Sequence, residues 1–300
     1  MIKHTNTLVN PQNGDLAFRI QTFEDNTPFD HLQRHNYYTI ILLTEGYGKL
    51  KADFSEYDFE GKTLFCFSPY QPYMLNSAEN SSLKGIIINF HADFFCIYRH
   101  QNDIASEGVL FDNIYLPPFF NLDEADLAQF DTLITQLNTE AQRRDTAQQE
   151  LLVLYLKIFL ITAMRIRVKQ QGQLEQQINQ NKEPFILQKL KDAIEIHYKN
   201  KHTASDYAAM LHITAKALAK MVKNHFHKTL TDLIGERIIM EAKRELYLTS
   251  KSVKEIAYIL GFKDEFYFSR FFKRNTDVSP QLYRDTVGFA KAEKLLLNAN

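Results

Sequence analysis

Two short segments in the last third of the chain carry basic side chains at helical spacing, and these are the residues best suited to chemistry on a polyanion. The segment 215–226 contains Lys220, and the segment 264–275 contains Arg270 and Lys273. Steps of three and four residues place side chains on one face of a helix. Lysine and arginine neutralise phosphates, and arginine can also donate two parallel hydrogen bonds to guanine. The pattern predicts two helices that contact double-stranded DNA.

The charge distribution supports a polyanionic partner for the C-terminal part alone. The 300 residues have a net charge of −1, yet residues 1–183 carry 15 basic against 23 acidic side chains, and residues 184–290 carry 18 against 12. Chance is the alternative explanation. An acidic first part followed by a basic last part is nevertheless typical of a chain in which only the second part meets nucleic acid.

The two basic segments belong to an internal repeat. DYAAMLHITAKALAKMVKNHF aligns with EIAYILGFKDEFYFSRFFKRN through Ala208 with Ala257 and Leu211 with Leu260. Each copy predicts a short helix, a tight turn and a longer basic helix, which is the helix-turn-helix arrangement. Gly261 suits a turn position with φ > 0. Residues 231–247 are expected to form a rigid helix that holds the modules apart, so that one chain reads major-groove segments about 34 Å apart.

Apolar positions of the two basic helices must face inward, and the others are left for DNA. Leu218, Met221 and Val222 are expected to pack in the first helix. The aromatic residues expected to hold the core of the second are Tyr267, Phe268, Phe271 and Phe272. The predicted DNA-binding residues are Lys216, Ala217, Lys220, Lys223, Asn224, Arg237, Lys263, Glu265, Phe266, Ser269, Arg270, Lys273 and Arg274.

These residues are expected to divide between base reading and phosphate contact. Arg270 is the best candidate for a bidentate contact with guanine, and Lys216 and Lys220 are its less selective counterparts. Phe266 is expected either to pack on a thymine methyl group or to make a core or interdomain contact. The predicted phosphate contacts are Lys223, Lys273, Arg274, Arg237 and Lys263. For each lysine, a solvated charge on a helix face is the alternative interpretation.

The helices that carry these residues form the last of three predicted regions. Helices are expected over residues 185–198, 204–211, 215–226, 231–247, 253–260, 264–275 and 280–285. The predicted regions are 1–168, strands followed by two helices; 169–184, a Gln/Asn-rich linker; and 185–290, a helical DNA-binding domain.

In the first region, the spacing of apolar residues changes from one typical of strands to one typical of helices near residue 116. Short apolar runs with Gly and Pro breaks predict six or more strands in a sandwich or small barrel, among them YYTIILLTE, KTLFCFSP, LKGIIINF and GVLF. Helical periodicity follows over 123–144 and again over 149–168. The second of these helices is apolar on most faces, which favours cover by a partner subunit and hence a homodimer. The predicted fold class is two-domain α+β.

Small-molecule chemistry in the first region is predicted only in outline. An effector site in the barrel would draw on Arg34, His35, Tyr37, Tyr38, Tyr70 and Tyr73. Ordinary packing is the alternative for each of them. A cupin metal motif needs a second histidine, but Tyr37 stands in that position, and His31 and His91 do not restore the spacing. No metal, cofactor or catalytic motif is therefore expected.

Targeting signals and cysteine usage suggest an ordinary intracellular chain. The longest apolar stretch, 151–164, has 14 residues with Lys157 in its middle, against roughly 20 needed to cross a bilayer. No export or import signal precedes it, so a cytoplasmic location without membrane contact is expected. Cys66 and Cys96 lack the spacing of a zinc or disulfide site and are interpreted as buried thiols.

The run SVKEIAYILGFKDEFYFSRFFKRNTDVSPQLYR resembles the C-terminal signature of the AraC/XylS family of bacterial transcription regulators, and ERIIMEAKREL resembles the connecting helix of that family. The resemblance covers about residues 186–286. It departs from the family pattern at Phe266, Asp277, His227 and Val222, of which Phe266 bears on base preference. RHNYYTIILLTEGYGKL resembles, more weakly, the opening strands of the family's sensor domain, which implies that residues 1–168 form a cupin-like sensor and dimerisation domain.

The resemblance implies a regulator that binds promoter DNA and acts on RNA polymerase. It favours an activator over a repressor, a small-molecule effector and a homodimer, with no catalysis. Two alternatives stay open from the residues alone. One is a cupin-type enzyme with an accessory DNA-binding domain, and the other is a DNA-binding protein whose first domain only dimerises.

Overall fold

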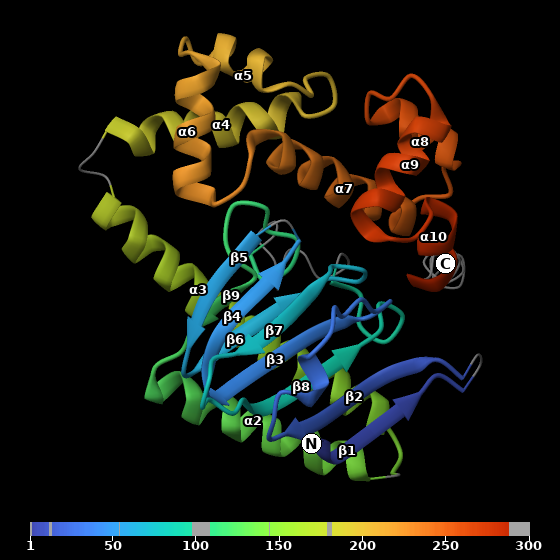
Figure 1. Cartoon of the computed structure of the whole chain (residues 1–300). Coiled ribbons are helices and arrows are strands. Elements are labelled where there is room, and N and C mark those ends of the chain that lie inside the picture. Colours follow the sequence, from blue (N-terminus) through green and yellow to red (C-terminus); the bar gives the residue numbers. More distant parts are fainter. Residues whose placement is uncertain are drawn as a thin grey trace. The chain divides into compact units, whose positions relative to one another are not determined.

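The computed structural model describes residues 2–11, 14–53, 55–97, 109–143, 145–178 and 182–287. The chain divides into two compact units (Figure 1). One comprises Met1–Asn113 and Pro117–Gln171, and the other Ile114–Leu116 and Gly172–Asn300. The division falls inside the predicted 169–184 linker. Most of that segment is nevertheless helical, because one helix continues to Ile178 and the next begins at Lys182.

The N-terminal unit is built on two antiparallel sheets. The larger has the strand order β1-β2-β8-β3-β6-β9, and the smaller has β5-β4-β7. The strands are β1 (Ile2–Val9), β2 (Leu16–Phe23), β3 (Tyr38–Glu45), β4 (Tyr47–Ala52), β5 (Ser55–Glu60), β6 (Thr63–Phe67), β7 (Tyr73–Ser77), β8 (Lys84–Phe90) and β9 (Phe119–Asn121), and a short 3-10 helix, η1, spans Thr27–Phe29. This confirms the β-rich first domain.

A core of aromatic and aliphatic side chains fills the space between the sheets. Phe23, Ile41 and Phe65 of the larger sheet share one buried cluster with Leu50 and Leu75 of the smaller. Strands β3, β4, β6 and β7 each contribute two alternate residues to this cluster, as the period of two requires. The cluster holds the two sheets face to face.

Helices α2 (Glu124–Gln142) and α3 (Gln148–Ile178) complete this unit. They cover the other face of the larger sheet (Figure 1). On α3, Leu152, Leu156, Phe159, Leu160 and Ala163 are fully buried. The helix thus has one face committed to the unit's own core.

Two details of the predicted strand pattern are wrong. The GVLF run, described from 109 to 111, forms no strand, and the ring of Phe111 packs on Tyr38 at 4.9 Å between centroids. Strands β1, β2, β5 and β9 lie outside the apolar runs from which strands were predicted, and most side chains of β1 are exposed. Cys66 is buried and Cys96 is half-buried; both are free thiols.

The C-terminal unit is helical, and its helix boundaries lie within three residues of those predicted. The helices are α4 (Lys182–His197), α5 (Ala204–Met210), α6 (Ala215–Phe226), α7 (Leu230–Leu248), α8 (Val253–Ile259), α9 (Glu265–Thr276) and α10 (Pro280–Val287). No helix in the described part of the chain is long and apolar enough to cross a membrane.

Candidate functional site

The sequence repeat corresponds to two helix-turn-helix modules: a first module of α5 and α6, and a second module of α8 and α9. Each of the four helices begins at a side-chain cap that accepts a backbone hydrogen bond, as Thr214 does from Ala217 in α6 and Asp264 from Tyr267 in α9. Such caps satisfy N–H groups that have no partner inside the helix. Ala208 and Ala257, at the predicted helix crossings, are buried.

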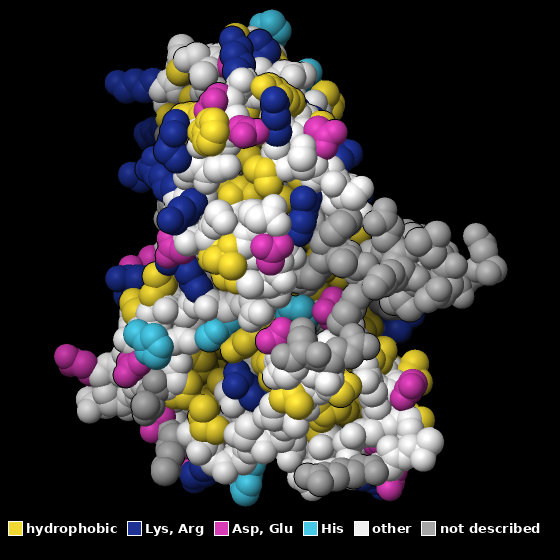
Figure 2. All heavy atoms as spheres, turned by 90° about the vertical axis from the view of Figure 1, so that its right-hand side faces the viewer, with side chains coloured by type: hydrophobic (Ala, Val, Ile, Leu, Met, Phe, Trp, Pro, Cys, Tyr) yellow, Lys and Arg dark blue, Asp and Glu magenta, His cyan; other side chains and the backbone are white. Residues whose placement is uncertain are grey.

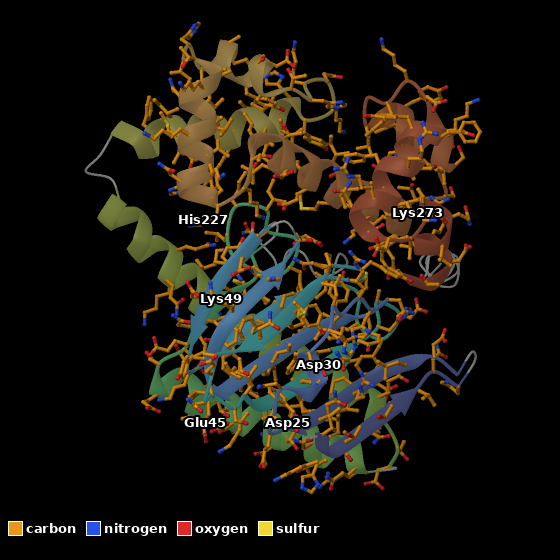
Figure 3. The ribbon with its side chains drawn as sticks, viewed as in Figure 1. Asp25, Asp30, Glu45, Lys49, His227 and Lys273 are labelled. Atoms are coloured by element: carbon orange, nitrogen blue, oxygen red, sulfur yellow. The ribbon has the colours of Figure 1, made fainter. Side chains whose placement is uncertain are left out.

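In the first module, α6 turns its apolar side inward and its basic side outward. Leu218 and Val222 are fully buried, and Met221 is half-buried. The predicted contact residues on this helix are all exposed, namely Lys216, Ala217, Lys220, Lys223 and Asn224. The helix ends at His227, whose φ of 57° places it in the left-handed region (Figure 3).

In the second module, α9 presents Arg270, Lys273 and Arg274 on its exposed side, with Lys273 labelled in Figure 3. Phe268 and Phe272 are buried, but Tyr267 is 58% exposed, so its predicted place in the core is wrong. Its ring contacts only the edge of the module, 5.9 Å from the ring of Phe262.

Phe266 lies outside the core of this unit. It is 66% exposed. With Glu265 and Ser269 it borders a groove of about 430 Å³ between α9 and the beginnings of α8 and α10, where Ser252 and Ser279 lie. Phe266 is therefore available to a ligand of the second module. Lysine and arginine side chains also gather along one side of the helical unit, in the upper part of Figure 2.

Arg237 corrects the predicted set of phosphate contacts. It is only 9% exposed. Its Nε donates to Glu195 Oε2 at 2.7 Å, its Nη1 donates to Glu241 Oε2 at 3.2 Å, and its guanidinium lies 4.1 Å from the centre of the Tyr198 ring. Both acids raise the pKa of Arg237 against the effect of its burial. The residue ties α4 to α7, so it is a structural residue.

The turn of the second module contacts the loop that joins α4 to α5. Gly261 in the turn of the second module has φ of 83°, and a Cβ placed there would lie 1.8 Å from the backbone oxygen of Lys199 in the α4–α5 loop. The ring of Phe262 lies 5.7 Å from that of His202 in the same loop. The expectation that α7 holds the modules apart is thus incomplete, because the loop before the first module supports the second.

The residues predicted to line an effector site mostly gather at one end of the β-sandwich. His35 stacks on Tyr37 at 4.7 Å between ring centres, and the backbone N–H of Tyr70 donates to the oxygen of His35 at 2.7 Å. Tyr73 is buried against Phe67, and Arg34 is half-buried. Burial, then the charges of Arg19 and His31, lower the pKa of His35 to about 4, so its ring is neutral at pH 7.

Tyr38 does not belong to this group. It stacks on Phe90 at 5.0 Å, on the face of the larger sheet opposite to Ile41. Tyr37 precedes β3 and stacks on His35, whereas the ring of Tyr38 is buried between Phe90 and Phe111. Its prediction as an effector contact is wrong.

Three residues at the same end were not predicted. Arg19 donates to Asn89 Oδ1 through Nε at 3.1 Å and Nη2 at 2.8 Å, and Asn89 donates to Thr39 Oγ1 at 3.0 Å. These residues come from β2, β8 and β3. The sequence alone does not show that these strands pair with one another. The three residues could have been found only if the pairing and register of the strands were known.

One hollow of the N-terminal unit contains none of the predicted effector residues. It has a volume of about 460 Å³ and is bordered by Lys49, Asp58, Phe59, Phe119 and Asn121, among others. Within the described residues, no three His, Cys, Asp or Glu side chains are grouped so as to hold a metal ion.

Comparison with known proteins agrees with both halves of the molecule. The model of an AraC-like ligand binding domain matches residues 19–156, and a helix-turn-helix domain model matches residues 207–286. Together they define a DNA-binding transcription regulator with a ligand-binding domain. The chain belongs to the AraC family of transcriptional regulators.

Curated relatives carry names of the same kind. The chain is 22% identical over 253 residues to the transcriptional activator RhaS of an Enterobacter species, covering 83% of this chain and 86% of the relative. It is 30% identical over 95 residues to the raffinose operon regulator RafR of Pediococcus pentosaceus, covering 32% and 34%. It is 25% identical to the activator Btr of Bacillus subtilis, covering 81% and 43%. The chain thus spans less than half the length of the latter two.

Two solved structures are similar to this chain with low TM-scores. ToxT of Vibrio cholerae is 15% identical with a TM-score of 0.39, covering 91% of this chain and 98% of that one. The C-terminal domain of the response regulator yesN of Fusobacterium nucleatum is 28% identical with a TM-score of 0.32, covering 32% and 95%.

Proposed function

We propose that this chain regulates transcription by reading promoter DNA with α6 and α9, under the control of a small-molecule effector bound by the N-terminal unit. The observation that carries the proposal is the exposure of a basic face on both recognition helices, in two copies of one module. A single recognition helix reads only a few base pairs, so two helices in one chain lengthen the sequence that is read.

Roles within the interface follow from the chemistry of each exposed side chain. Arg270 reads guanine, because its planar fork matches two acceptors of that base, and Lys216 and Lys220 contact bases or phosphates in the first module. Phe266 packs against a thymine methyl group from its exposed position. Lys223, Lys263, Lys273 and Arg274 contact phosphates, which fixes the position of the protein on the duplex.

Genome-wide binding of the tagged full-length protein in its host tests this proposal. A double variant, Lys220→Ala with Arg270→Ala, is expected to lose discrete promoter peaks. A matched variant, Lys49→Ala with Arg143→Ala, removes the same two kinds of charge from the exposed surface of the N-terminal unit and is expected to keep them. Diffuse binding by the wild-type protein, or equal peaks in the two variants, would refute sequence reading by these helices.

We also propose that the protein is a homodimer joined through α3. Opposite its buried face, this helix exposes Leu151, Leu154, Ile158 and Val168. They lie along one stripe at the 3.6-residue period, and a second copy of the same stripe is the self-complementary partner that two-fold symmetry provides.

Sedimentation analysis of the full-length protein over a range of concentrations tests this interface. Leu154→Asp with Ile158→Asp is expected to give monomers, because two charges would then be buried at the centre of the stripe. Gln136→Asp, at an exposed position of α2, is the control and is expected to keep the dimer. A wild-type monomer at all concentrations would exclude the interface.

Activation is proposed as the direction of regulation, since the relatives RhaS and Btr are named transcriptional activators. Effector binding would change the population of dimer states that place the DNA-binding units on neighbouring sites, and would thereby bring RNA polymerase to the promoter. Transcription in vitro from a bound promoter should rise when the protein is added. A fall would reverse the assigned direction while leaving DNA reading intact.

A further inference from the structure

Three residues from the first half of the sequence belong to the helical unit. Ile114–Leu116, called here the inserted segment, group with Gly172–Asn300, whereas Asn113 and Pro117 on either side of them group with the N-terminal unit. The inserted segment lies well before the predicted 169–184 linker. A division of the sequence into two continuous domains therefore leaves these residues out of the unit in which they pack.

Tyr115 of the inserted segment contacts two helices of the unit. Its hydroxyl donates to Glu195 Oε1 of α4 at 2.9 Å, and its ring lies 5.9 Å from the ring of Phe226, the last residue of α6. Burial, then the charge of Glu195, raise the pKa of Tyr115, so its hydroxyl stays protonated and remains a donor at neutral pH. Tyr115 thus joins α4 to the end of the first recognition helix.

Two cations of the unit extend this contact. The Nζ of Lys191 in α4 lies 5.6 Å from the centre of the Tyr115 ring and 5.8 Å from that of Phe226. A cation within about 6 Å of a ring centre is attracted to the face of the ring. The second oxygen of Glu195, Oε2, accepts from Arg237 of α7 at 2.7 Å. One carboxylate therefore links the inserted segment to α7 as well.

The backbone of the inserted segment makes a separate contact just beyond α6. The Nζ of Lys228 donates to the oxygen of Ile114 at 3.4 Å and to Glu236 Oε2 of α7 at 2.8 Å. Lys228 is only 7% exposed, and a buried ammonium has three N–H groups to satisfy. Phe226 and Lys228 flank His227, the residue at which α6 ends. The inserted segment therefore contacts the chain on both sides of this helix end.

Contacts at the end of α6 matter for the residues near its beginning. Lys220 lies about 9 Å along the helix axis from Phe226, at about 1.5 Å per residue. A short helix tilts as one body, so freedom at Phe226 becomes displacement at Lys220. Side chains that recognise a ligand must be held within about 0.5 Å of the productive geometry. Small movements at the inserted segment are therefore enough to change contacts with bases.

We infer that the inserted segment completes the first helix-turn-helix module, with Tyr115 as a positioning residue for α6. The consequence at DNA rests on the proposed function of α6 as a recognition helix. The inserted segment fixes the end of that helix, and this determines where Lys216 and Lys220 meet the duplex. Sequence reading by the first module thus depends on residues outside the predicted DNA-binding domain.

Hydrogen exchange of backbone amides, measured by mass spectrometry on the full-length protein, tests the placement of the segment. Tyr115→Ala is expected to speed exchange in the last turn of α6 by about tenfold, because a ring contact and a hydrogen bond to a carboxylate are lost together. Tyr115→Phe keeps the ring and should speed exchange only a few-fold. Amides of α9 should exchange as in the wild type in both variants.

The matched control is Tyr57→Ala in the N-terminal unit. Tyr57 is also half-buried, and its ring lies 5.9 Å from that of Phe119 in the same unit. The control should leave exchange in both recognition helices unchanged. The same acceleration in Tyr57→Ala would show a general loosening of the chain and would overturn the inference.

A measurement on DNA separates a positioning role from a general loss of stability. Footprinting on a site selected from random DNA assigns a segment to each module: protection weakens at the α6 segment in Lys216→Ala with Lys220→Ala, and at the α9 segment in Arg270→Ala with Lys273→Ala. Competition with single-base variants of the site then gives the discrimination in each segment. Tyr115→Ala should lower discrimination in the α6 segment about fivefold and leave the α9 segment unchanged.

Unchanged exchange in α6 of folded Tyr115→Ala would overturn the inference, as would an equal loss of discrimination in both DNA segments. If Tyr115→Ala does not fold, Tyr115→Phe is used for both measurements, and exchange in α6 identical to the wild type is the contrary result. A wild-type protein that binds no DNA sequence specifically would reject the proposed function. Exchange alone would then decide the inference, and acceleration confined to α6 in the Tyr115 variants would support it.

Discussion

The two helix-turn-helix modules share one local design. The first helix of each begins at a hydroxyl cap with an acidic residue three positions on, Thr203 with Asp206 and Ser252 with Glu255. The second helix of each ends at a residue in the left-handed region, which is not glycine in either case. The backbone of the module is therefore specified twice by the same kind of local signal.

The modules differ in what surrounds the turn. In the first, the turn residue is His212 with φ of 54°, and it is exposed. In the second it is Gly261, with the oxygen of Lys199 at the place a Cβ would occupy. The same turn is thus free at one module and fitted against a neighbouring loop at the other.

Attachment to α7 differs as well. The first module's side of the unit is tied to α7 by Arg237 through carboxylates, as described above. In the second, Arg284 of α10 donates to the backbone oxygen of Leu246 in α7 at 3.1 Å, and to those of Thr249 at 3.4 Å and Lys251 at 2.6 Å in the segment that follows α7. The two modules therefore share a local fold but are held in place by different contacts. The second module depends more on contacts with backbone atoms of neighbouring segments.

Gly261→Ala should produce the largest effect. The left-handed φ costs a residue with a Cβ about 1–3 kcal/mol, and displacing the Lys199 backbone adds a comparable amount, so the loss in unfolding free energy is about 4 kcal/mol. The mirror change, His212→Gly, should leave stability unchanged or slightly higher, because glycine accepts the same φ without strain. Thermal unfolding of both full-length variants checks the contrast. A loss for Gly261→Ala no larger than the about 1–3 kcal/mol of the turn angle alone would show that the Lys199 contact does not matter.

Arg237→Ala should destabilise the helical unit by about 3 kcal/mol, because the exposed Arg244 is then the one cation of the described residues that pairs with the buried Glu241 carboxylate. Arg284→Ala removes hydrogen bonds to neutral carbonyls and should cost about 2 kcal/mol. Arg244→Ala, which removes the exposed partner, should cost less than about 1 kcal/mol. Urea titrations of the three variants give the order. A larger loss of unfolding free energy for Arg284→Ala than for Arg237→Ala would contradict the assignment of Arg237 as the stronger support.

The exposed faces predict a difference in how the modules read DNA. Arg270→Ala should lower discrimination at one base pair by about 1–3 kcal/mol, because bidentate guanine contact is lost. Lys220→Ala should weaken binding to all sequences more evenly and reduce the slope of log affinity against log salt by about one. Competition binding with single-base variants of a selected site, at several salt concentrations, separates the two. An even loss for Arg270→Ala would assign it to phosphate.

Features that depend on neighbouring residues in the sequence were predicted correctly, whereas features that depend on distant residues were not. Helix limits in the second half followed from caps and periodicity, which act within a few residues. Arg237 was misplaced because its partner Glu195 lies 42 residues away on another helix, and a basic residue next to a recognition module reads the same whether it is paired or free. Tyr267 was misplaced because an aromatic residue at the first turn of α9 can lie on the rim instead of inside.

Contacts within the sheets were even harder to predict from the sequence, because they join residues that are far apart in the chain. Arg19 and Asn89 are 70 residues apart and meet only because β2 pairs with β8 in one register. Tyr37 and Tyr38 could not be separated without knowing which face of β3 meets the second sheet. Strand register depends on long-range pairing, so the composition of the effector end was partly predictable and its arrangement was not.

The smallest effect concerns pH, and it should be the same in both modules. The Ser252 backbone and side chain lower the pKa of Glu255 from its ordinary value of 4.5, and the Thr203 side chain lowers that of Asp206 from 3.8. A carboxyl group with a lowered pKa in the folded state adds stability above its unfolded pKa, and this contribution disappears as the pH falls through the folded value. The unfolding temperature is measured between pH 6 and pH 3. It should fall less steeply than that of the wild type below about pH 4.5 for Glu255→Gln, and below about pH 4 for Asp206→Asn. Since both groups are fully exposed caps, the two variants should differ little from one another. A large pH effect confined to one module would show that its cap is coupled to the tertiary supports that distinguish the modules.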